Sequence, residues 1–177
     1  SAEDPRFYSE GAVDVWGTLR GAVSTVAGGN VQGGSSITQQ YVKNVEVEKC
    51  EALTSQKKVQ ACYNDAAGVT LQRKVQEMRY AVQVEKTYNK KQILTGYLNV
   101  VGFGGQVYGV QAAAQYYFNT TAAKLDLAQA ATLAAILNNP ANLRIDQPDN
   151  KDNGAANGYK LTKERRDYVL NRMYVTH

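Results

Sequence analysis

The first group of residues that could carry chemistry lies at the start of this 177-residue chain. Four carboxylates, Glu3, Asp4, Glu10 and Asp14, surround Arg6. A positioned carboxylate can take a proton from, or give one to, a reacting group. Acidic residues at this density also occur where a helix begins, because they match its dipole. The pattern alone leaves both interpretations open.

A second polar group reads GGSSITQQYVKN, from Gly33 to Asn44. Hydroxyl residues directly before Ile37 are typical of a helix N-cap, and an N-cap is our default interpretation. Alternatively, Gln39, Gln40 and Lys43 form a clamp for anions and hydroxyl groups. The sequence of neither the first nor the second group distinguishes between its two interpretations.

The third group lies on a helix predicted from Val69 to Tyr88. One apolar face is formed by Leu71, Val75, Met78 and Val82, which are spaced four, three and four residues apart. The opposite face is also apolar, with Tyr80, Ala81, Val84 and Tyr88 around Arg73 and Glu77. This predicts a helix packed on two sides. Glu77 is then either an ordinary i,i+4 partner of Arg73 or a carboxylate directed into a cleft.

Composition excludes several kinds of site. The single histidine is His177 at the last position, so no Ser-His-Asp triad, HExxH zinc helix or Cys-His pair is available. Acid and base catalysis would fall to Asp, Glu, Lys or Tyr. The net charge of +4 and a pI near 9.0 are consistent with an anionic partner, which could be phosphate, nucleic acid or a lipid surface. An ordinary solvated surface is the alternative.

Two cysteines, Cys50 and Cys62, bound a polar segment that we expect to be an exposed loop. A disulfide between them would stabilise the chain by about 3 kcal/mol through loop entropy. Two unrelated free thiols are the alternative. A zinc site is improbable because no third cysteine or internal histidine accompanies them.

The remaining chain predicts a mainly α fold of about six to nine helices. A glycine-rich segment from Gly102 to Gly109 lacks the GK[ST] ending of a phosphate loop and is interpreted as a structural turn. Ile145 to Gly158 is a polar loop. Further helices are expected at 90–99, at 110–118, at 125–139 as a buried central helix, and at 163–175 with Val169 and Met173 inward.

Five motifs follow one another along the chain: EDxRFY at Glu3, GGSSITQQxxKN at Gly33, RKxxE at Arg73, KxxILxxYLN at Lys90 and RRxxVLxRM at Arg165. This series resembles the peptidoglycan glycosyltransferase family, whose members polymerise lipid II alone or as the first catalytic domain of class A penicillin-binding proteins. The cysteine-bounded insert is most similar to actinobacterial bifunctional members. The chain departs from the family pattern at Glu10 and Ala12, which replace its usual histidine and glycine. It departs again at residues 102–106, which read GFGGQ where the family has aromatic-Phe-Gly-Asn-Gly.

The resemblance implies a lysozyme-like helical lobe with a small mobile jaw, here from about Val45 to Gly68, within one glycosyltransferase domain over residues 1–177. A membrane anchor and any transpeptidase domain are expected outside this sequence. The implied location is the extracytoplasmic face of the bacterial plasma membrane. The implied partners are lipid II, the growing glycan chain, the membrane surface and other cell-wall synthesis proteins, and nucleic acid is not among them.

The resemblance also assigns roles in an inverting transfer that releases undecaprenyl pyrophosphate. Glu3 is the general base on the acceptor 4-hydroxyl group, and Glu77 acts on the leaving pyrophosphate through a divalent cation, Mg or Mn, with no organic cofactor. We expect both carboxylates to face one groove, farther apart than the ~6.5–9.5 Å of inverting glycosidases. The expected substrate and pyrophosphate contacts are Arg6, Ser36, Gln39, Gln40, Lys43, Arg73 and Lys74.

Two other functions compete with this interpretation. A lysozyme-like enzyme that cuts glycan strands would need only one glutamate in a helical domain, but it would not need a clamp for pyrophosphate. A basic module without enzymatic activity would bind anionic polymers or membranes in a salt-sensitive manner.

Overall fold

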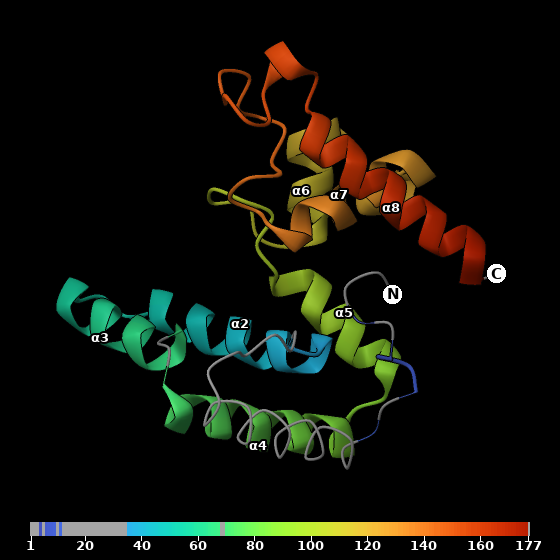
Figure 1. Cartoon of the computed structure of the whole chain (residues 1–177). Helices are drawn as coiled ribbons and strands as arrows, with labels where there is room; N and C mark the ends of the chain where they lie inside the picture. The colour runs from blue at the N-terminus through green and yellow to red at the C-terminus, as the bar shows by residue number, and fades with distance from the viewer. Residues whose placement is uncertain (1–3, 5, 10, 12–34, 68–69, 177) are drawn as a thin grey trace, which may run out of the picture. The chain divides into compact units, whose positions relative to one another are not determined.

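The computed structural model describes residues 4, 6–9, 11, 35–67 and 70–176. Two compact units are present, one within residues 4–97 and one whose described part covers 98–176. Figure 1 shows the elements of each unit. Glu3, Glu10, Ala12 and Asp14 lie outside the residues that the structure describes.

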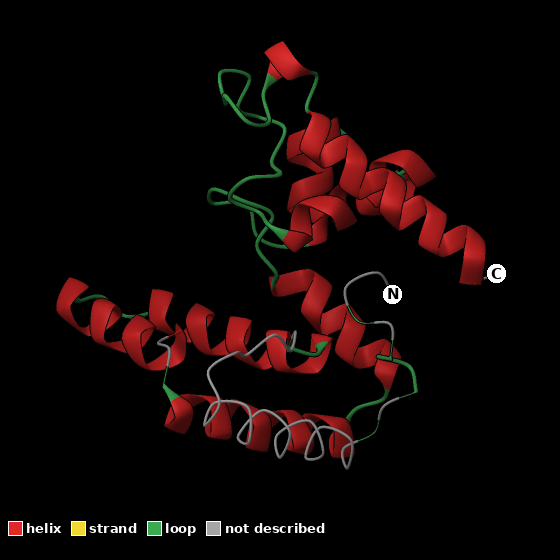
Figure 2. Cartoon of the chain, viewed as in Figure 1, coloured by secondary structure: helices red, strands yellow, loops and turns green. Residues whose placement is uncertain are grey.

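Helices account for the regular structure of the described residues, and no strand occurs among them (Figure 2). This confirms the mainly α prediction. Seven α-helices are present in these ranges, together with the 3-10 helices η1 (Ala122–Lys124) and η2 (Ala155–Asn157). The α-helices are α2 (Ile37–Glu51), α3 (Gln56–Ala67), α4 (Leu71–Thr87), α5 (Lys90–Val100), α6 (Val110–Phe118), α7 (Leu127–Asn138) and α8 (Lys160–Thr176).

Helix α2 begins as the hydroxyl residues predict. Ser36 is its N-cap, and its hydroxyl oxygen accepts from the Gln39 amide at 3.3 Å. The Gln39 side chain accepts in return from the Ser36 amide at 3.2 Å, which completes a capping box. The helix therefore starts without unsatisfied amides at either position.

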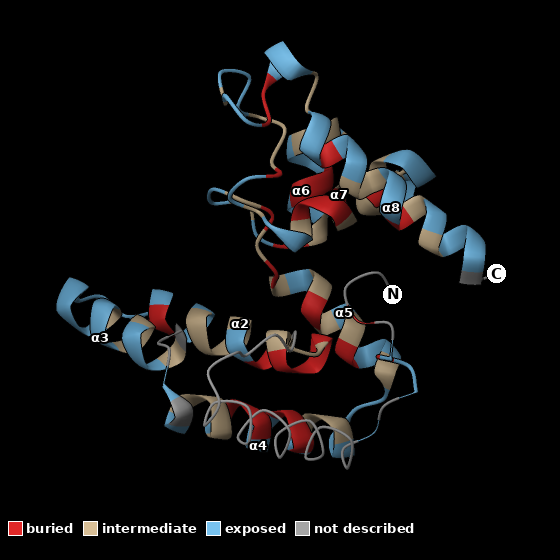
Figure 3. Cartoon of the chain, viewed as in Figure 1, coloured by how far each residue is buried: buried red, intermediate tan, exposed pale blue. Residues whose placement is uncertain are grey.

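The core of the 4–97 unit lies where α2 packs against α4. Val42 of α2 meets Met78, Ala81 and Val82 of α4 in a buried apolar cluster (Figure 3). The predicted inward face of α4 is thus confirmed at Met78 and Val82. The second predicted face is confirmed only in part: Ala81 is buried and Val84 packs against the same cluster, whereas Tyr80 and Tyr88 are 44% and 50% exposed. Their hydroxyl groups let tyrosines lie at a surface with one end in water.

The segment between the cysteines also differs from expectation. Residues 56–67 form α3, and only a short connection separates α3 from α2. Cys50 and Cys62 are joined by a disulfide with an S–S distance of 1.96 Å and a Cα–Cα distance of 5.5 Å. The bond therefore links the last turn of α2 to the middle of α3, rather than closing an irregular loop. The assignment of residues 45–68 to a mobile jaw stays a prediction.

In the 98–176 unit, α7 packs against α8 and α6. The predicted buried helix is buried mainly in its second half, with Leu133 and Ile136 inward, whereas Leu127 is 60% exposed. On α8, Val169 is buried as predicted, but Met173 is 41% exposed. Since α8 has 17 residues and α7 has 12, the C-terminal turns of α8 extend beyond the α7 contact (Figure 3).

The glycine-rich segment is a structural turn, as expected. The Phe103 amide donates to the Val107 carbonyl at 2.8 Å, and Gly104 and Gly105 have φ angles of 99° and 58°. A Cβ at Gly104 would lie 2.7 Å from the Pro140 carbonyl oxygen, so a side chain has no room there. Arg144 lies close beside Gly105.

Arg144 belongs to a polar cluster in the same unit. Its guanidinium donates twice to Asp146, at 2.6 and 2.5 Å, and Tyr116 donates to the same carboxylate at 2.7 Å. The Arg144 hydrogen bonds lower the pKa of Asp146 to about 2. Burial raises the pKa of the neighbouring Tyr117 to about 12, and its hydroxyl donates to the Phe103 carbonyl at 2.8 Å. This cluster holds the glycine turn.

The long polar loop is anchored by Asn153, which is fully buried. Its side-chain amide donates to the Asn142 carbonyl at 3.0 Å and to the Thr162 hydroxyl at 2.7 Å. Its side-chain carbonyl accepts from the Thr162 amide at 3.2 Å, and Thr162 donates to the Leu143 carbonyl at 2.7 Å. The loop is thereby tied to the start of α8.

Replacing Asn153 with alanine is expected to lower the free energy of unfolding by about 3 kcal/mol, because several buried polar groups lose their partners. Denaturant unfolding followed by circular dichroism measures the change. Asn171→Ala, on an exposed position of α8, is the control and should stay within about 0.5 kcal/mol of the parent. Equal stability of the two variants would contradict the anchoring role.

No helix in the described ranges is both long and apolar enough to span a membrane.

Candidate functional site

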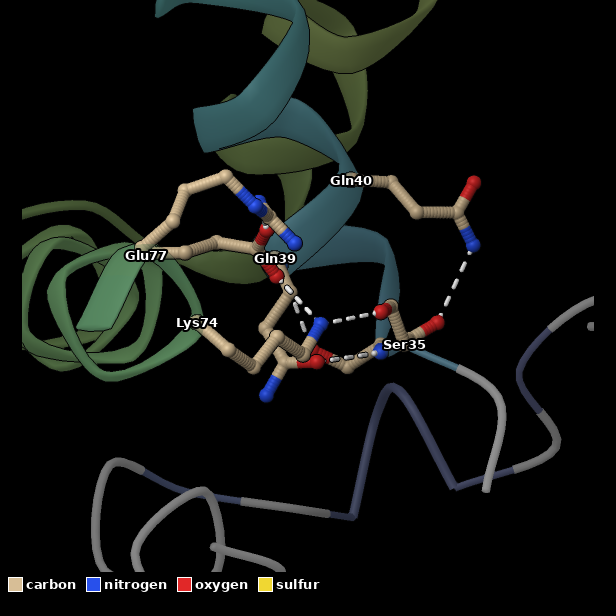
Figure 4. Close-up of polar contacts among 7 residues, drawn as sticks. Ser35, Gln39, Gln40, Lys74 and Glu77 are labelled. Atoms are coloured by element: carbon tan, nitrogen blue, oxygen red, sulfur yellow. Dashed lines mark hydrogen bonds and ion pairs between the residues drawn. The ribbon is translucent and has the colours of Figure 1, made fainter. Parts of the chain in front are cut away.

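Glu77 is the acidic residue of the predicted site that the structure describes, and it is buried, with 5% of its surface exposed. It lies on α4, where Lys74 Nζ approaches its Oε1 atom at 2.5 Å and Arg73 Nη1 contacts its Oε2 atom (Figure 4). Each carboxylate oxygen therefore has a cationic partner. The ion-pair interpretation of Glu77 holds, with Lys74 as a second partner that the sequence pattern did not indicate.

Lys74 also connects this carboxylate to the segment before α2. Its ammonium group donates to Ser35 Oγ at 2.5 Å, and the Ser35 carbonyl accepts from the Gln40 side chain at 3.0 Å (Figure 4). Gln40 in turn accepts from the Tyr97 hydroxyl of α5 at 3.1 Å. One polar network thus fixes the position of Glu77 relative to α2 and α5.

A pocket of about 610 Å³ lies between α2, α3 and α4. Three residues of the predicted site, Lys43, Arg73 and Glu77, line it together. The other lining residues are Val42, Glu46, Lys49, Leu53, Lys58, Ala61, Cys62, Asp65, Ala66, Gln76 and Tyr80. Four cations and three carboxylates among the lining residues give the pocket a net positive charge of one.

Five other predicted residues that the structure describes do not line this pocket. Lys74 is paired with Glu77 and Ser35. Ser36 and Gln39 are engaged by the capping box, and Gln40 by Ser35 and Tyr97. Arg6 is exposed on the segment that follows Glu3. Contact of these five side chains with substrate stays a prediction, as does a groove shared by Glu3 and Glu77.

The sequence analysis missed the wall that α3 provides. Lys58, Ala61, Cys62 and Asp65 line the pocket at the spacing i, i+3, i+4 and i+7. That spacing describes one face of a helix, so it was the signal that could have found them. This spacing was not recognised because the segment between the cysteines was interpreted as a loop.

The residues after Glu3 are anchored on the start of α2. Asp4 is 8% exposed, and its carboxylate accepts from the Ile37 amide at 3.0 Å and from the Arg6 amide at 3.2 Å. A carboxylate at this position matches the partial positive charge of the helix N-terminus. The dipole interpretation of the acidic cluster therefore holds for Asp4.

Phe7 provides a second anchor for the same segment. Its ring is 1% exposed, and the Lys90 ammonium group lies 4.7 Å from the ring centroid. Lys90 also pairs with the buried Glu85 carboxylate at 2.7 Å, which accepts from the Thr38 hydroxyl as well. Four elements of the 4–97 unit meet at this cluster.

Replacing Lys90 with methionine is expected to lower the free energy of unfolding by about 3 kcal/mol, because Glu85 is left as a buried charge without its ammonium partner. Chemical denaturation measures the change, and Lys90→Met/Glu85→Leu should recover part of the loss. Lys91→Met removes an exposed charge and is the control. An equal loss of unfolding free energy in Lys90→Met and Lys91→Met would show that the Lys90–Glu85 ion pair does not stabilise the fold.

A family model described as Transglycosylase matches residues 1–174. The chain belongs to the transglycosylase family. Its curated relatives include penicillin-binding protein 1A of Rickettsia typhi, which is 34% identical over an alignment of 178 positions that covers 98% of this chain and 19% of that protein. A monofunctional glycosyltransferase of Staphylococcus saprophyticus is 34% identical over an alignment of 180 positions that covers 97% of this chain and 60% of that protein. A monofunctional glycosyltransferase of Staphylococcus aureus strain JH9 is 38% identical over an alignment of 153 positions that covers 82% of this chain and 50% of that protein.

These matches confirm the resemblance carried by the five motifs. The transglycosylase chain spans about a fifth of the penicillin-binding protein 1A relative and about 60% of the first monofunctional one. The fourth and fifth motifs contribute packing contacts, in addition to the contacts of the first three described above. Ile93 and Tyr97 of the fourth motif are buried, and Val169 of the fifth is buried while Arg165 stacks over Tyr168 at 4.7 Å.

Proposed function

We propose that this transglycosylase domain polymerises lipid II into peptidoglycan glycan strands by inverting transfer, with release of undecaprenyl pyrophosphate. The observation that carries the proposal is the buried Glu77 carboxylate between Arg73 and Lys74, beside a basic pocket that includes Lys43. A site for a leaving pyrophosphate needs fixed positive charge where negative charge develops. The family membership supports the same reaction.

In the proposed step, Glu3 removes the proton from the acceptor 4-hydroxyl group. The hydroxyl oxygen forms a bond to the anomeric carbon of the donor, and the bond from that carbon to the pyrophosphate oxygen breaks. The electron pair leaves with the pyrophosphate, whose charge Lys43, Arg73, Lys74 and Arg6 stabilise. Inversion follows because the two bonds lie on opposite sides of the anomeric carbon.

Glu77 has a positioning role in this proposal. A carboxylate beside a pyrophosphate would repel it, but Arg73 and Lys74 together outweigh the charge of Glu77 by one. Because both oxygens already bind cations, Glu77 does not fit the expected role of metal ligand. The described residues also contain no group of three or more His, Cys, Asp or Glu side chains that could hold a metal ion. We propose that Mg or Mn enters as part of the lipid pyrophosphate substrate.

The proposed substrates place the reaction at the extracytoplasmic face of the plasma membrane, where a lipid-linked donor and the growing glycan chain would both be accessible. A basic pocket suits a lipid pyrophosphate at an anionic membrane surface. Contacts with other cell-wall synthesis proteins are part of the same proposal, and binding of nucleic acid is not.

The test compares two substrates. With lipid II and a divalent metal the protein should form glycan polymer, and with finished peptidoglycan it should release no fragments. Release of fragments from finished peptidoglycan without lipid II would support the cutting enzyme. Salt-sensitive polyanion binding without either activity would support the binding module.

A further inference from the structure

We infer that α3 contributes Lys58 as an anion-binding residue to the pocket between α2, α3 and α4, and that the Cys50–Cys62 disulfide keeps it there. The inference rests on the proposed function, because the anion is the pyrophosphate group of the donor. Lys58 comes from the cysteine-bounded insert and from none of the five motifs.

The pocket-facing side of α3 singles out Lys58. Lys58, Ala61, Cys62 and Asp65 share one face of the helix and line the pocket, whereas the adjacent Lys57 does not. Asp65 lies seven residues farther along, which is about 10 Å along a helix axis. The Lys58 ammonium group and the Asp65 carboxylate are therefore at opposite ends of this helix face.

The charges around the pocket leave Lys58 available for a ligand. Lys49 pairs with Glu46 at 2.6 Å, and Arg73 pairs with Glu77. Lys58 forms no ion pair within the described part of the chain, and the same is true of Lys43. An ammonium group with no carboxylate partner can give its charge to an incoming phosphate oxygen.

The disulfide is the covalent link between α3 and the rest of its unit. Helix α3 also packs against α2 and α4, but no side chain described on it is fully buried. Cys50 is fully buried in α2, and Cys62 is itself a lining residue of the pocket. The hydrogen bond from the Tyr63 hydroxyl to Glu51, at 2.8 Å, is exposed. Loss of the covalent bond should therefore release α3 and withdraw Lys58 from the pocket.

Lys58→Gln tests the first half of the inference, with Lys57→Gln as the matched control on the same exposed helix. The KM for lipid II should rise about tenfold in Lys58→Gln with kcat within about twofold, because a binding contact common to ground state and transition state is lost. Lys57→Gln should leave both constants within about twofold. Calorimetric titration with inorganic pyrophosphate should show the same order of affinities.

Cys50→Ser/Cys62→Ser tests the second half. This variant should show a similar rise in KM, and adding Lys58→Gln should raise it little further, because the two changes remove one contact. An unchanged KM without the disulfide would overturn its role. Equal KM and pyrophosphate affinity in Lys58→Gln and Lys57→Gln would overturn the role of Lys58. Failure of the parent protein to polymerise lipid II would instead refute the proposed function, and pyrophosphate titration would still test Lys58.

Discussion

Glu3→Gln is expected to lower the rate of lipid II polymerisation by about 10²- to 10⁴-fold, which is the usual range for removal of a general base. Glutamine keeps the size and hydrogen-bonding capacity of glutamate but cannot remove the proton from the 4-hydroxyl group of the acceptor. The KM should change little, because the donor pocket between α2, α3 and α4 retains its charges. Gel separation of labelled glycan products, with kcat and KM determined separately, measures the effect.

Asp14→Asn is the control for this prediction, since Asp14 belongs to the same acidic cluster but not to the EDxRFY motif. Its activity should stay within about threefold of the parent. Near-native activity of Glu3→Gln would mean that another group is the base. Asp4 and Phe7 of the same motif contact the start of α2 and Lys90, respectively.

Glu77→Gln is expected to lower kcat by about 10²-fold, because Arg73 and Lys74 lose the carboxylate that aims them at the leaving group. The effect on stability should be small. The two basic side chains are 19% and 31% exposed, so they can turn toward water when the carboxylate charge is removed. The same polymerisation assay measures kcat, and thermal unfolding checks the fold.

Glu46→Gln provides the matched control, since Glu46 also lines the pocket and pairs with Lys49 on a more exposed part of α2. Its kcat should remain within about threefold. Raising the Mg²⁺ concentration should not restore Glu77→Gln, because the carboxylate acts through two cationic side chains. Recovery of activity at high Mg²⁺ would show that Glu77 binds the metal after all.

Local sequence patterns predicted much of the helical structure, because residues close in sequence determine where these helices begin and end. Helix α6 runs from Val110 to Phe118 as expected, because Gly109 precedes it and Asn119 ends it in the left-handed conformation. The α2 start followed from Ser36 and Gln39, whose side chains cap amides three residues away. Such short-range hydrogen bonds are determined by a few neighbouring residues.

Features set by distant contacts were not predictable in the same way. Helix α3 has no fully buried side chain among those that the structure describes, and the bond from Cys62 to Cys50 joins it to α2. Exposure of Met173 depends on where α7 ends, and the partnership of Lys74 with Ser35 joins residues 39 positions apart. The i,i+4 spacing along one helix indicated the ion pair between Arg73 and Glu77. It could not indicate a hydrogen bond to the hydroxyl group of Ser35, which lies in another segment.

The most direct measurement counts the undecaprenyl pyrophosphate released and the glycosidic bonds formed in one reaction with lipid II. A polymerising glycosyltransferase should release one lipid pyrophosphate for each bond, and Glu3→Gln should suppress both products together. Lipid pyrophosphate released without new glycosidic bonds, or new reducing ends without lipid pyrophosphate, would contradict the proposed transfer.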